Sequence, residues 1–249
     1  MMTTVMLHPV GLDGQCFQFL TSPELADAVR YDCLWHGGRR EPAGPLTIEA
    51  MAEDLAEHTT GALDLVGVSM GAQVAQLLAM RRPERVRSLL ITSGANPAEK
   101  ERQASKRPEA AEIAAMVRRR GIGDVLDWVL DRWFTKHVLA DPNHPGVSYV
   151  RTRLLANSTE QFAAGWAALA APRPSLEEQA ESLTMPTTVL HPTQDHTAVE
   201  TRRALVDVLP NARLVTRKGP HLVQLEAPQA FQAAVLDHLD WVLRTTEIQ

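Results

Sequence analysis

Cysteines, aromatic residues and long apolar stretches are all scarce in this 249-residue sequence. The two cysteines, Cys16 and Cys33, cannot form a disulfide framework, and unpaired thiols are typical of a reducing compartment. No apolar run approaches the roughly 20 residues needed to span a bilayer. The N-terminus also lacks a basic stretch followed by an apolar one, so we expect no signal peptide. The sequence therefore predicts a cytoplasmic protein that does not contact the membrane.

A strong charge of either sign is missing as well. The formal net charge is −5, and the arginine-rich spots are short and isolated. They lie at residues 39–40, 118–120 and 202–203. Such spots are typical of solvated faces, and they predict no nucleic-acid partner. The sequence contains neither the G-x-G-x-x-G nor the H-E-x-x-H motif, so it predicts no cofactor and no metal centre.

What the sequence does contain is an alternation of strand-like and helix-like segments. Six short apolar runs favour β-strands, at residues 3–8, 29–35, 63–68, 86–92, 187–191 and 212–216. Helical periodicity is found between most of them, at residues 47–60, 70–82, 199–209 and 222–243. This alternation predicts an α/β fold whose mainly parallel sheet of about six strands is flanked by helices.

The alternation stops between Pro97 and Thr184, where the sequence has helical spacing and no convincing strand. We interpret this stretch as a helical cap, inserted after the fourth strand over the carboxyl edge of the sheet, where ligands bind in open α/β folds. The predicted domains are therefore a discontinuous core, residues 1–96 and 185–249, and a cap, residues 97–184. The cap aromatics, among them Trp128 and Trp133, are interpreted as its own core, and Trp133 is the best candidate for also binding substrate.

A candidate nucleophile follows the third predicted strand. Gly67, Ser69 and Gly71 form a G-x-S-x-G motif with an apolar strand before it and a helical run after it. A serine on such a sharp turn needs small residues two positions away on either side, so that strand and helix can approach each other. The N–H of Met70 would then point toward a developing oxyanion. The alternative is a glycine-rich turn with a buried serine.

The base and the acid are expected beyond the last two strands, in the chain order Ser–Asp–His. His221 follows the last strand and would take the Ser69 proton, whereas His191 and His196 lie where the acid is expected. Asp195 follows the preceding strand and would orient the imidazole, unless it only caps the next helix. Asp207 falls inside a helix. The other six histidines are interpreted as loop or surface residues: His8, His36, His58, His137, His144 and His238.

The elbow, the triad order, the loop after the first strand, the turn at residues 32–37 and the block at residues 219–228 together resemble an α/β-hydrolase. In that superfamily the first loop reads His-Gly and then the oxyanion donor, which would be the N–H of Val10. This chain has Pro9 in place of the glycine, and proline has no N–H to donate, so Gly11 is the alternative donor. Because the sequence begins at the first strand, the two N-terminal strands common in the superfamily are expected to be absent.

Residues of the predicted cap make the resemblance specific to one group of the superfamily. Residues 130–135 and 150–155, together with residues 69–89, are similar to the 3-oxoadipate enol-lactone hydrolases. The chain departs from that group at Leu34-Trp35, where an Arg-Gly pair is usual, and in the first loop. Both departures lie near the expected substrate pocket, so the identity of the lactone stays open. Arg132 and Arg153 are each explained equally well as carboxylate ligands or as parts of a solvated face.

These features predict a cytoplasmic hydrolase of small carboxylic esters or lactones, acting through an acyl-enzyme on Ser69. Its partner would be a small molecule, and the chain would be a monomer or a homodimer. The alternatives are other chemistry on the same fold (C–C bond hydrolysis, thioester hydrolysis or cofactor-free haloperoxidase activity) and a ligand sensor that retains the triad.

Overall fold

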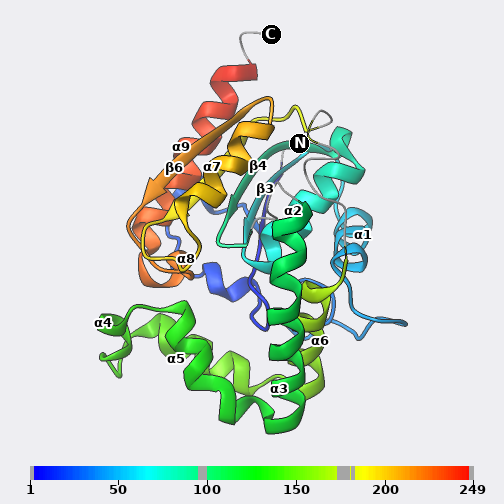
Figure 1. The fold of residues 1–249 in the computed structure, drawn as a ribbon. Coiled ribbons are helices and arrows are strands. Elements are labelled where there is room, and N and C mark those ends of the chain that lie inside the picture. Colours follow the sequence, from blue (N-terminus) through cyan, green and yellow to red (C-terminus); the bar gives the residue numbers. More distant parts are fainter. Residues whose placement is uncertain (1–2, 95–99, 173–179, 181–182, 247–249) are drawn as a thin grey trace.

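The computed structural model describes residues 3–94, 100–172, 180 and 183–246. Six parallel strands form one sheet in the order β2-β1-β3-β4-β5-β6 (Figure 1). The strands are β1 (Thr3–Leu7), β2 (Val29–Tyr31), β3 (Leu63–Val68), β4 (Val86–Thr92), β5 (Thr187–Pro192) and β6 (Ala212–Arg217). The strand order reverses direction beside β1, which places the carboxyl ends of β1 and β3 at the point where ligands bind in open α/β sheets. The predicted fold class is confirmed.

The second strand is shorter than its apolar run indicates. It ends at Tyr31, and the chain then turns through Trp35, whose φ is +58°. The carboxylate of Asp32 accepts a 2.7 Å hydrogen bond from the N–H of Gly14, which joins the start of this turn to the segment after β1. The hydrophobic residues at 33–35 are therefore part of a loop, and the strand prediction to residue 35 is wrong.

Helices flank the sheet on both sides. Helix α1 (Ile48–His58) packs on α2 (Met70–Arg81), which contacts β1, β3 and β4; α7 (Val199–Val208) lies on β5 and β6. The predicted helix over residues 222–243 is in fact two, α8 (Val223–Glu226) and α9 (Pro228–Thr246). Proline cannot continue a helix from the preceding turn, and α9 begins at Pro228. The described part of the core also contains the short 3₁₀ helices η1 (Gly14–Phe17), η2 (Pro23–Leu25) and η3 (Pro83–Arg85).

A buried histidine joins a helix to the sheet. His8 and His36 lie in loops, as the sequence predicts, although both are fully buried. His238 is fully buried in α9, so the interpretation as a loop or surface residue is wrong there. His238 on α9 binds the hydroxyls of Thr188 (2.9 Å) and Ser88 (3.1 Å), which belong to β5 and β4. Burial lowers the pKa of His238 to about 3, so the ring is neutral where it joins helix to sheet.

Between β4 and β5 the chain forms the helical insertion that the sequence predicts. Its described part contains α3 (Lys100–Trp133), α4 (Lys136–Leu139), α5 (Pro145–Leu155) and α6 (Thr159–Ala170) (Figure 1). Gly121 breaks α3 into two helical parts, since its φ of +78° is outside the helical region. We propose that residues 97–184 form the cap and residues 1–96 and 185–249 the core; residue 97 itself lies outside the described residues.

The cap has an aromatic core, as expected, but not all of its aromatics contribute. Trp133 and Phe162 are almost completely buried, whereas Trp128 is 42% exposed and lies beside a cavity.

No helix among the described residues is long and apolar enough to cross a membrane.

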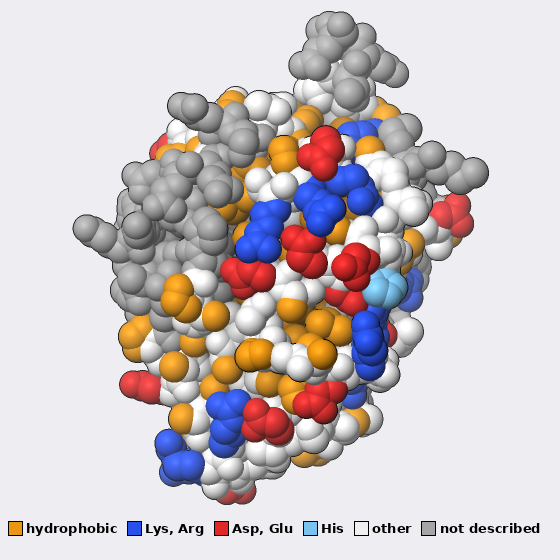
Figure 2. Space-filling model, turned by 90° about the vertical axis from the view of Figure 1, so that its right-hand side faces the viewer, with side chains coloured by type: hydrophobic (Ala, Val, Ile, Leu, Met, Phe, Trp, Pro, Cys, Tyr) orange, Lys and Arg blue, Asp and Glu red, His pale blue; other side chains and the backbone are white. Residues whose placement is uncertain are grey.

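Acidic and basic side chains lie next to one another on the face shown in Figure 2. Among the described residues of the arginine-rich spots, Arg39 forms an ion pair with Asp54 (2.8 Å), Arg118 with Glu160 (2.6 Å) and Arg202 with Asp195 (3.4 Å). Arg202 is different. Its side chain is almost fully buried, so the expectation of a solvated face is wrong at this position.

Candidate active site

Ser69 stands on a strained turn between β3 and α2. Its φ and ψ are 56° and −115°, and its N–H donates to the carbonyl of Thr92 on the neighbouring strand (2.9 Å). A Cβ on Gly67 would lie 2.6 Å from the Cα of Ala72, and one on Gly71 would lie 2.2 Å from the carbonyl oxygen of Leu7. The backbone therefore requires both glycines of the motif, for the steric reason that the sequence indicates.

The structure brings Ser69, His221 and Asp195 together from three separate strand ends. His221 Nε2 lies 3.1 Å from Ser69 Oγ, and His221 Nδ1 lies 3.2 Å from Asp195 Oδ1. An ionised carboxylate only accepts hydrogen bonds, so Nδ1 carries the proton of the neutral ring. Nε2 then has a free lone pair and accepts the hydrogen bond from the Ser69 hydroxyl, which is the orientation that a general base needs.

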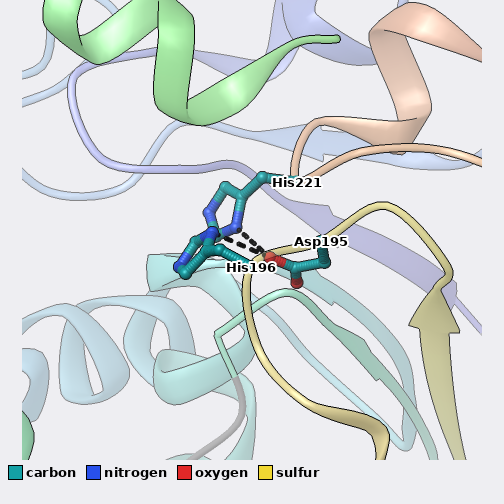
Figure 3. A group of neighbouring side chains, drawn as sticks. All are labelled: Asp195, His196 and His221. Carbon is teal, nitrogen blue, oxygen red and sulfur yellow. Dashed lines mark hydrogen bonds and ion pairs between the residues drawn. The ribbon is translucent and has the colours of Figure 1, made fainter.

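Asp195 is held by more partners than the sequence indicates. Its side chain is fully buried, Arg202 lies 3.4 Å from Oδ2, and the Nδ1 of His196 lies 3.0 Å from Oδ1 (Figure 3). Burial alone would raise the pKa of Asp195, but the charges and hydrogen bonds of His221 and His196 outweigh it and hold this pKa well below its usual range. Asp195 is therefore ionised at neutral pH.

The other residues considered for the acid or the base lie elsewhere in the structure. His191 is buried in β5, and burial lowers its pKa. Asp207 lies on the exposed side of α7. His196 contacts Asp195, with its ring stacked on that of His221 at a centroid distance of 5.0 Å. The Ser69 hydroxyl bonds His221.

Activity is expected to rise with pH and to reach a plateau, because His221 must be neutral to accept a proton. Burial lowers the pKa of His221 below its usual value of 6.5, and the Asp195 carboxylate offsets only part of this effect. The midpoint of the kcat/KM profile should therefore fall below about 6.5. The profile is to be measured with a chelator present, and a flat profile between about pH 5 and 9 would contradict the assignment of His221 as base.

An acid-stability control belongs with this profile. The buried rings of His8 and His36 have pKa values lowered to about 4 and about 3, so the unfolded chain binds protons at these sites before the folded chain does. The folded state accordingly loses stability as the pH falls from about 6.5, the ordinary histidine pKa, toward these lowered values. Each acidic sample should regain full activity when it is returned to pH 7.5.

The loop after β1 lies against the elbow, where the oxyanion donors are expected. The carbonyl of His8 accepts the N–H of Gly71 (3.1 Å), and the N–H of Leu12 donates to Pro9 (3.2 Å), which closes a tight turn through Val10 and Gly11. Within the described residues, no acceptor binds the N–H of Val10, Gly11 or Met70. Buried amides are rarely left without a partner, so these N–H groups are suited to a ligand oxygen, and the choice between Val10 and Gly11 stays open.

His8 fixes the start of this loop. Its Nε2 accepts the N–H of Cys33 (2.9 Å), so the ring proton is on Nδ1, which donates to the carbonyl of Pro9 (2.8 Å). The sequence does not reveal this role, because a histidine after a strand is equally typical of an exposed loop.

The cap holds the same loop from the other side. Asn157, which follows α5, donates to the carbonyl of Gly11 (2.8 Å), and Tyr149 donates to the carboxylate of Asp13 (2.8 Å). Gly11 has a φ of +74°, and a Cβ there would lie 2.5 Å from the ring of Phe162. The loop after β1 is therefore held between the sheet and the helical insertion.

Replacing Asn157 by alanine should loosen this clamp and lower kcat by up to about 100-fold, the cost of displacing a reacting group by roughly 1 Å. KM should change little, because Asn157 acts through the loop and not on the substrate. Steady-state kinetics checks this, with the exposed Asn143→Ala as the matched control. Equal kinetics for the two variants would show that the Gly11 contact does not position the loop.

A cavity of about 440 Å³ lies between the end of α3 and the loops that carry Asp195 and His221. It is lined by Trp128, Asp131, Arg132, Phe134, Thr135, Gln194, His196 and Pro220. Arg132 pairs with Glu109 (2.6 Å) at its edge, whereas Arg153 pairs with Asp13 (2.6 Å). Trp133 is 1% exposed and is flanked in sequence by two lining residues, so its contact with substrate stays a prediction.

Comparisons with known proteins agree with this architecture. Residues 4–234 match the model of the alpha/beta hydrolase family. The 3-oxoadipate enol-lactonase 2 of Acinetobacter baylyi is 29% identical over 212 residues, which cover 83% of this chain and 76% of that protein. These findings confirm the two resemblances that the sequence indicates.

Two solved structures extend the comparison. The enol-lactonase of Burkholderia xenovorans LB400 superposes with a TM-score of 0.80 at 25% identity, covering 96% of this chain and 91% of that one. A thermophilic esterase of Thermogutta terrifontis superposes with a TM-score of 0.81 at 26% identity, covering 97% of this chain and 90% of that one. Both structures therefore superpose on this chain over most of their length.

Proposed function

The chain belongs to the alpha/beta hydrolase family, and from this premise we propose that it is a serine hydrolase that cleaves a small carboxylic ester or lactone. The observation that carries the proposal is the continuous hydrogen-bonded path from Ser69 through His221 to Asp195. A nucleophile, a base and an orienting carboxylate in this order are the groups that acyl transfer requires.

In the proposed mechanism, Ser69 Oγ attacks the carbonyl carbon while its proton passes to His221 Nε2. The N–H groups of Met70 and of Val10, or Gly11 in its place, stabilise the oxyanion. His221 then returns the proton to the leaving alkoxide or enolate, which forms the acyl-enzyme. Water attacks this ester while His221 takes its proton, and His221 then gives that proton to Ser69 Oγ as the bond to the acyl carbon breaks and the carboxylic acid leaves. Asp195 keeps the proton of the resting imidazole on Nδ1 and stabilises the imidazolium formed in each half-reaction.

For the substrate, we propose a small lactone similar to a 3-oxoadipate enol-lactone, as the names of two relatives indicate. In an enol lactone the leaving group is an enolate, which is weakly basic and stays tethered to the acyl chain. The cavity next to His196, with Arg132 in its lining, provides space for a small polar molecule. We propose that Trp133, which lies in sequence between the lining residues Arg132 and Phe134, also contacts the substrate.

A matched substrate screen tests the proposal. Enol lactones, the corresponding saturated lactones and p-nitrophenyl esters of increasing acyl length are compared with the same enzyme preparation. A kcat/KM that is highest for the enol lactone supports the finer proposal, and one that is highest for a p-nitrophenyl ester supports an esterase. No turnover of any oxygen ester would overturn the proposal.

Two other readings of the same site predict different results. An enzyme for thioester hydrolysis, C–C bond hydrolysis or haloperoxidase chemistry would turn over substrates of its own class and would show little activity with oxygen esters. A ligand sensor would give no burst and almost no turnover with an activated ester, because chemistry is not its role. The proposal includes a cytoplasmic location, a small molecule as the only required partner, no cofactor, and a monomer or homodimer.

A further inference from the structure

A second histidine shares the carboxylate of the proposed triad. The imidazole of His196 stacks on that of His221, with 27° between the ring planes, and both Nδ1 atoms face Asp195 Oδ1 (Figure 3). In the proposed ester hydrolysis His221 is the general base, and His196 takes part in no step. Two imidazoles and a carboxylate converging on one point are a donor set that transition metals prefer.

We propose that Asp195, His196 and His221 form an inhibitory site for Zn²⁺ or a similar borderline-soft divalent cation. Zinc bonds of about 2.0–2.1 Å in a tetrahedron separate the ligand atoms by roughly 3.3 Å. The two Nδ1 atoms already lie 3.0 and 3.2 Å from Oδ1, and all three ligand atoms lie within 4.8 Å of one another. A movement of a few tenths of an ångström brings those two separations to the zinc geometry.

Access to the site is from the side of His196. The side chains of His221 and Asp195 are buried, whereas that of His196 is 39% exposed and lines the 440 Å³ cavity. Water in this cavity can supply the fourth ligand of the ion. Arg202 binds Asp195 Oδ2 on the opposite side, so Oδ1 is the oxygen left for a cation.

The bound cation blocks the base by changing its tautomer. Zinc takes the lone pair of Nδ1 in neutral His221, so the ring proton moves from Nδ1 to Nε2 through solvent. His196 exchanges its proton in the same way, and no net proton is released when both rings begin neutral. His221 Nε2–H then donates to Ser69 Oγ and cannot accept its proton, so the nucleophile stays a neutral hydroxyl. The inhibition rests on the proposed hydrolase function, whereas the binding does not.

The test uses tag-free protein, Zn²⁺ as the probe and Mg²⁺ as the control ion, because Mg²⁺ prefers oxygen ligands. Each variant is normalised to its own rate in chelator. Zn²⁺ should inhibit the wild type and be reversed by chelator. His196→Gln should raise the half-inhibitory concentration by at least the roughly 10–100-fold that is typical of changes in a second ligand shell. The exposed His137→Gln is the matched control and should behave as the wild type.

Binding is measured separately, by competition with a chromophoric chelator, in Ser69→Ala, which keeps all three ligands. One equivalent of Zn²⁺ should bind, and the added His196→Gln change should abolish the competition. Equal zinc binding with and without His196, or equal inhibition by Mg²⁺, would overturn the proposal. Zinc binding by a protein with no esterase or lactonase activity would instead support the site and contradict the proposed function.

Discussion

Ser69→Ala is expected to lower kcat by on the order of 10⁴–10⁶-fold, the loss typical of removing the nucleophile from a serine triad. His221→Ala should cost about as much, because the two residues act as one unit and their losses do not add. Asp195→Asn should cost somewhat less, on the order of 10⁴-fold, since an amide can favour the wrong tautomer of His221 while leaving the nucleophile in place. Single-turnover and steady-state kinetics on the best substrate of the screen measure these losses.

Ser93→Ala is the matched control for this experiment. Ser93 is 4% exposed and has a φ of +58°, whereas Ser69 is 8% exposed and has a φ of +56°. Both are buried serines with left-handed backbone at the end of a strand, but Ser93 has no role in the proposed chemistry. It should keep most of the activity. If Ser69→Ala retained more than about a tenth of the wild-type rate, the nucleophile would have to be another residue.

Covalent labelling checks the same assignment without a known substrate. A fluorophosphonate should modify the wild type at Ser69, as peptide mass spectrometry would show, and it should leave Ser69→Ala unlabelled. Labelling of His221→Ala should be much slower, because its serine lacks the base that removes the proton. Equal labelling rates for wild type and His221→Ala would separate His221 from the activation of the nucleophile.

The parts of the site that the sequence predicts are those fixed by local backbone rules. A G-x-S-x-G motif between a strand and a helix determines the turn at Ser69, and the chain order of the strands determines where Asp195 and His221 can lie. The parallel direction of the strands also follows from the alternation of strands and helices, since parallel strands need crossover connections. In each case a few neighbouring residues carry the constraint, so no distant contact has to be known.

The parts that the sequence does not predict depend on contacts between distant segments. Arg202 has the periodicity of a solvated helical residue, and only the packing of α7 on β5 buries it beside Asp195. Asn157 contacts Gly11 across 146 positions, and a lone asparagine after a helix gives no signal of this. His238 is similar: its two hydroxyl partners come from different strands, and a histidine in an amphipathic helix is equally typical of the surface.

Val10→Pro is expected to lower kcat by on the order of 10²–10³-fold, the loss typical of one oxyanion-hole donor. The structure indicates that this substitution can remove the amide hydrogen without disrupting the turn. Val10 is the second residue of the turn closed by Leu12 and Pro9, and Gly11 follows it with a φ of +74°. Proline is favoured at that position of a type II turn, where glycine follows it, so the variant removes the amide hydrogen while the turn is kept.

The control must remove the side chain and leave the amide. Val10 packs against α6, since a Cβ on Gly165 would lie 2.6 Å from its Cγ2, and Val10→Ala reports the loss of that contact alone. Gly11→Pro cannot serve as the opposite control, because proline is locked near a φ of −65° and Gly11 requires +74°.

A crystal structure with a phosphonate on Ser69 decides between the donors. If the phosphonyl oxygen lay beyond about 3.5 Å from the Val10 nitrogen and within hydrogen-bond distance of Gly11, the donor would be Gly11. Val10→Pro would then have little effect on kcat beyond that of Val10→Ala, and the kinetic and structural results would have to agree on one residue.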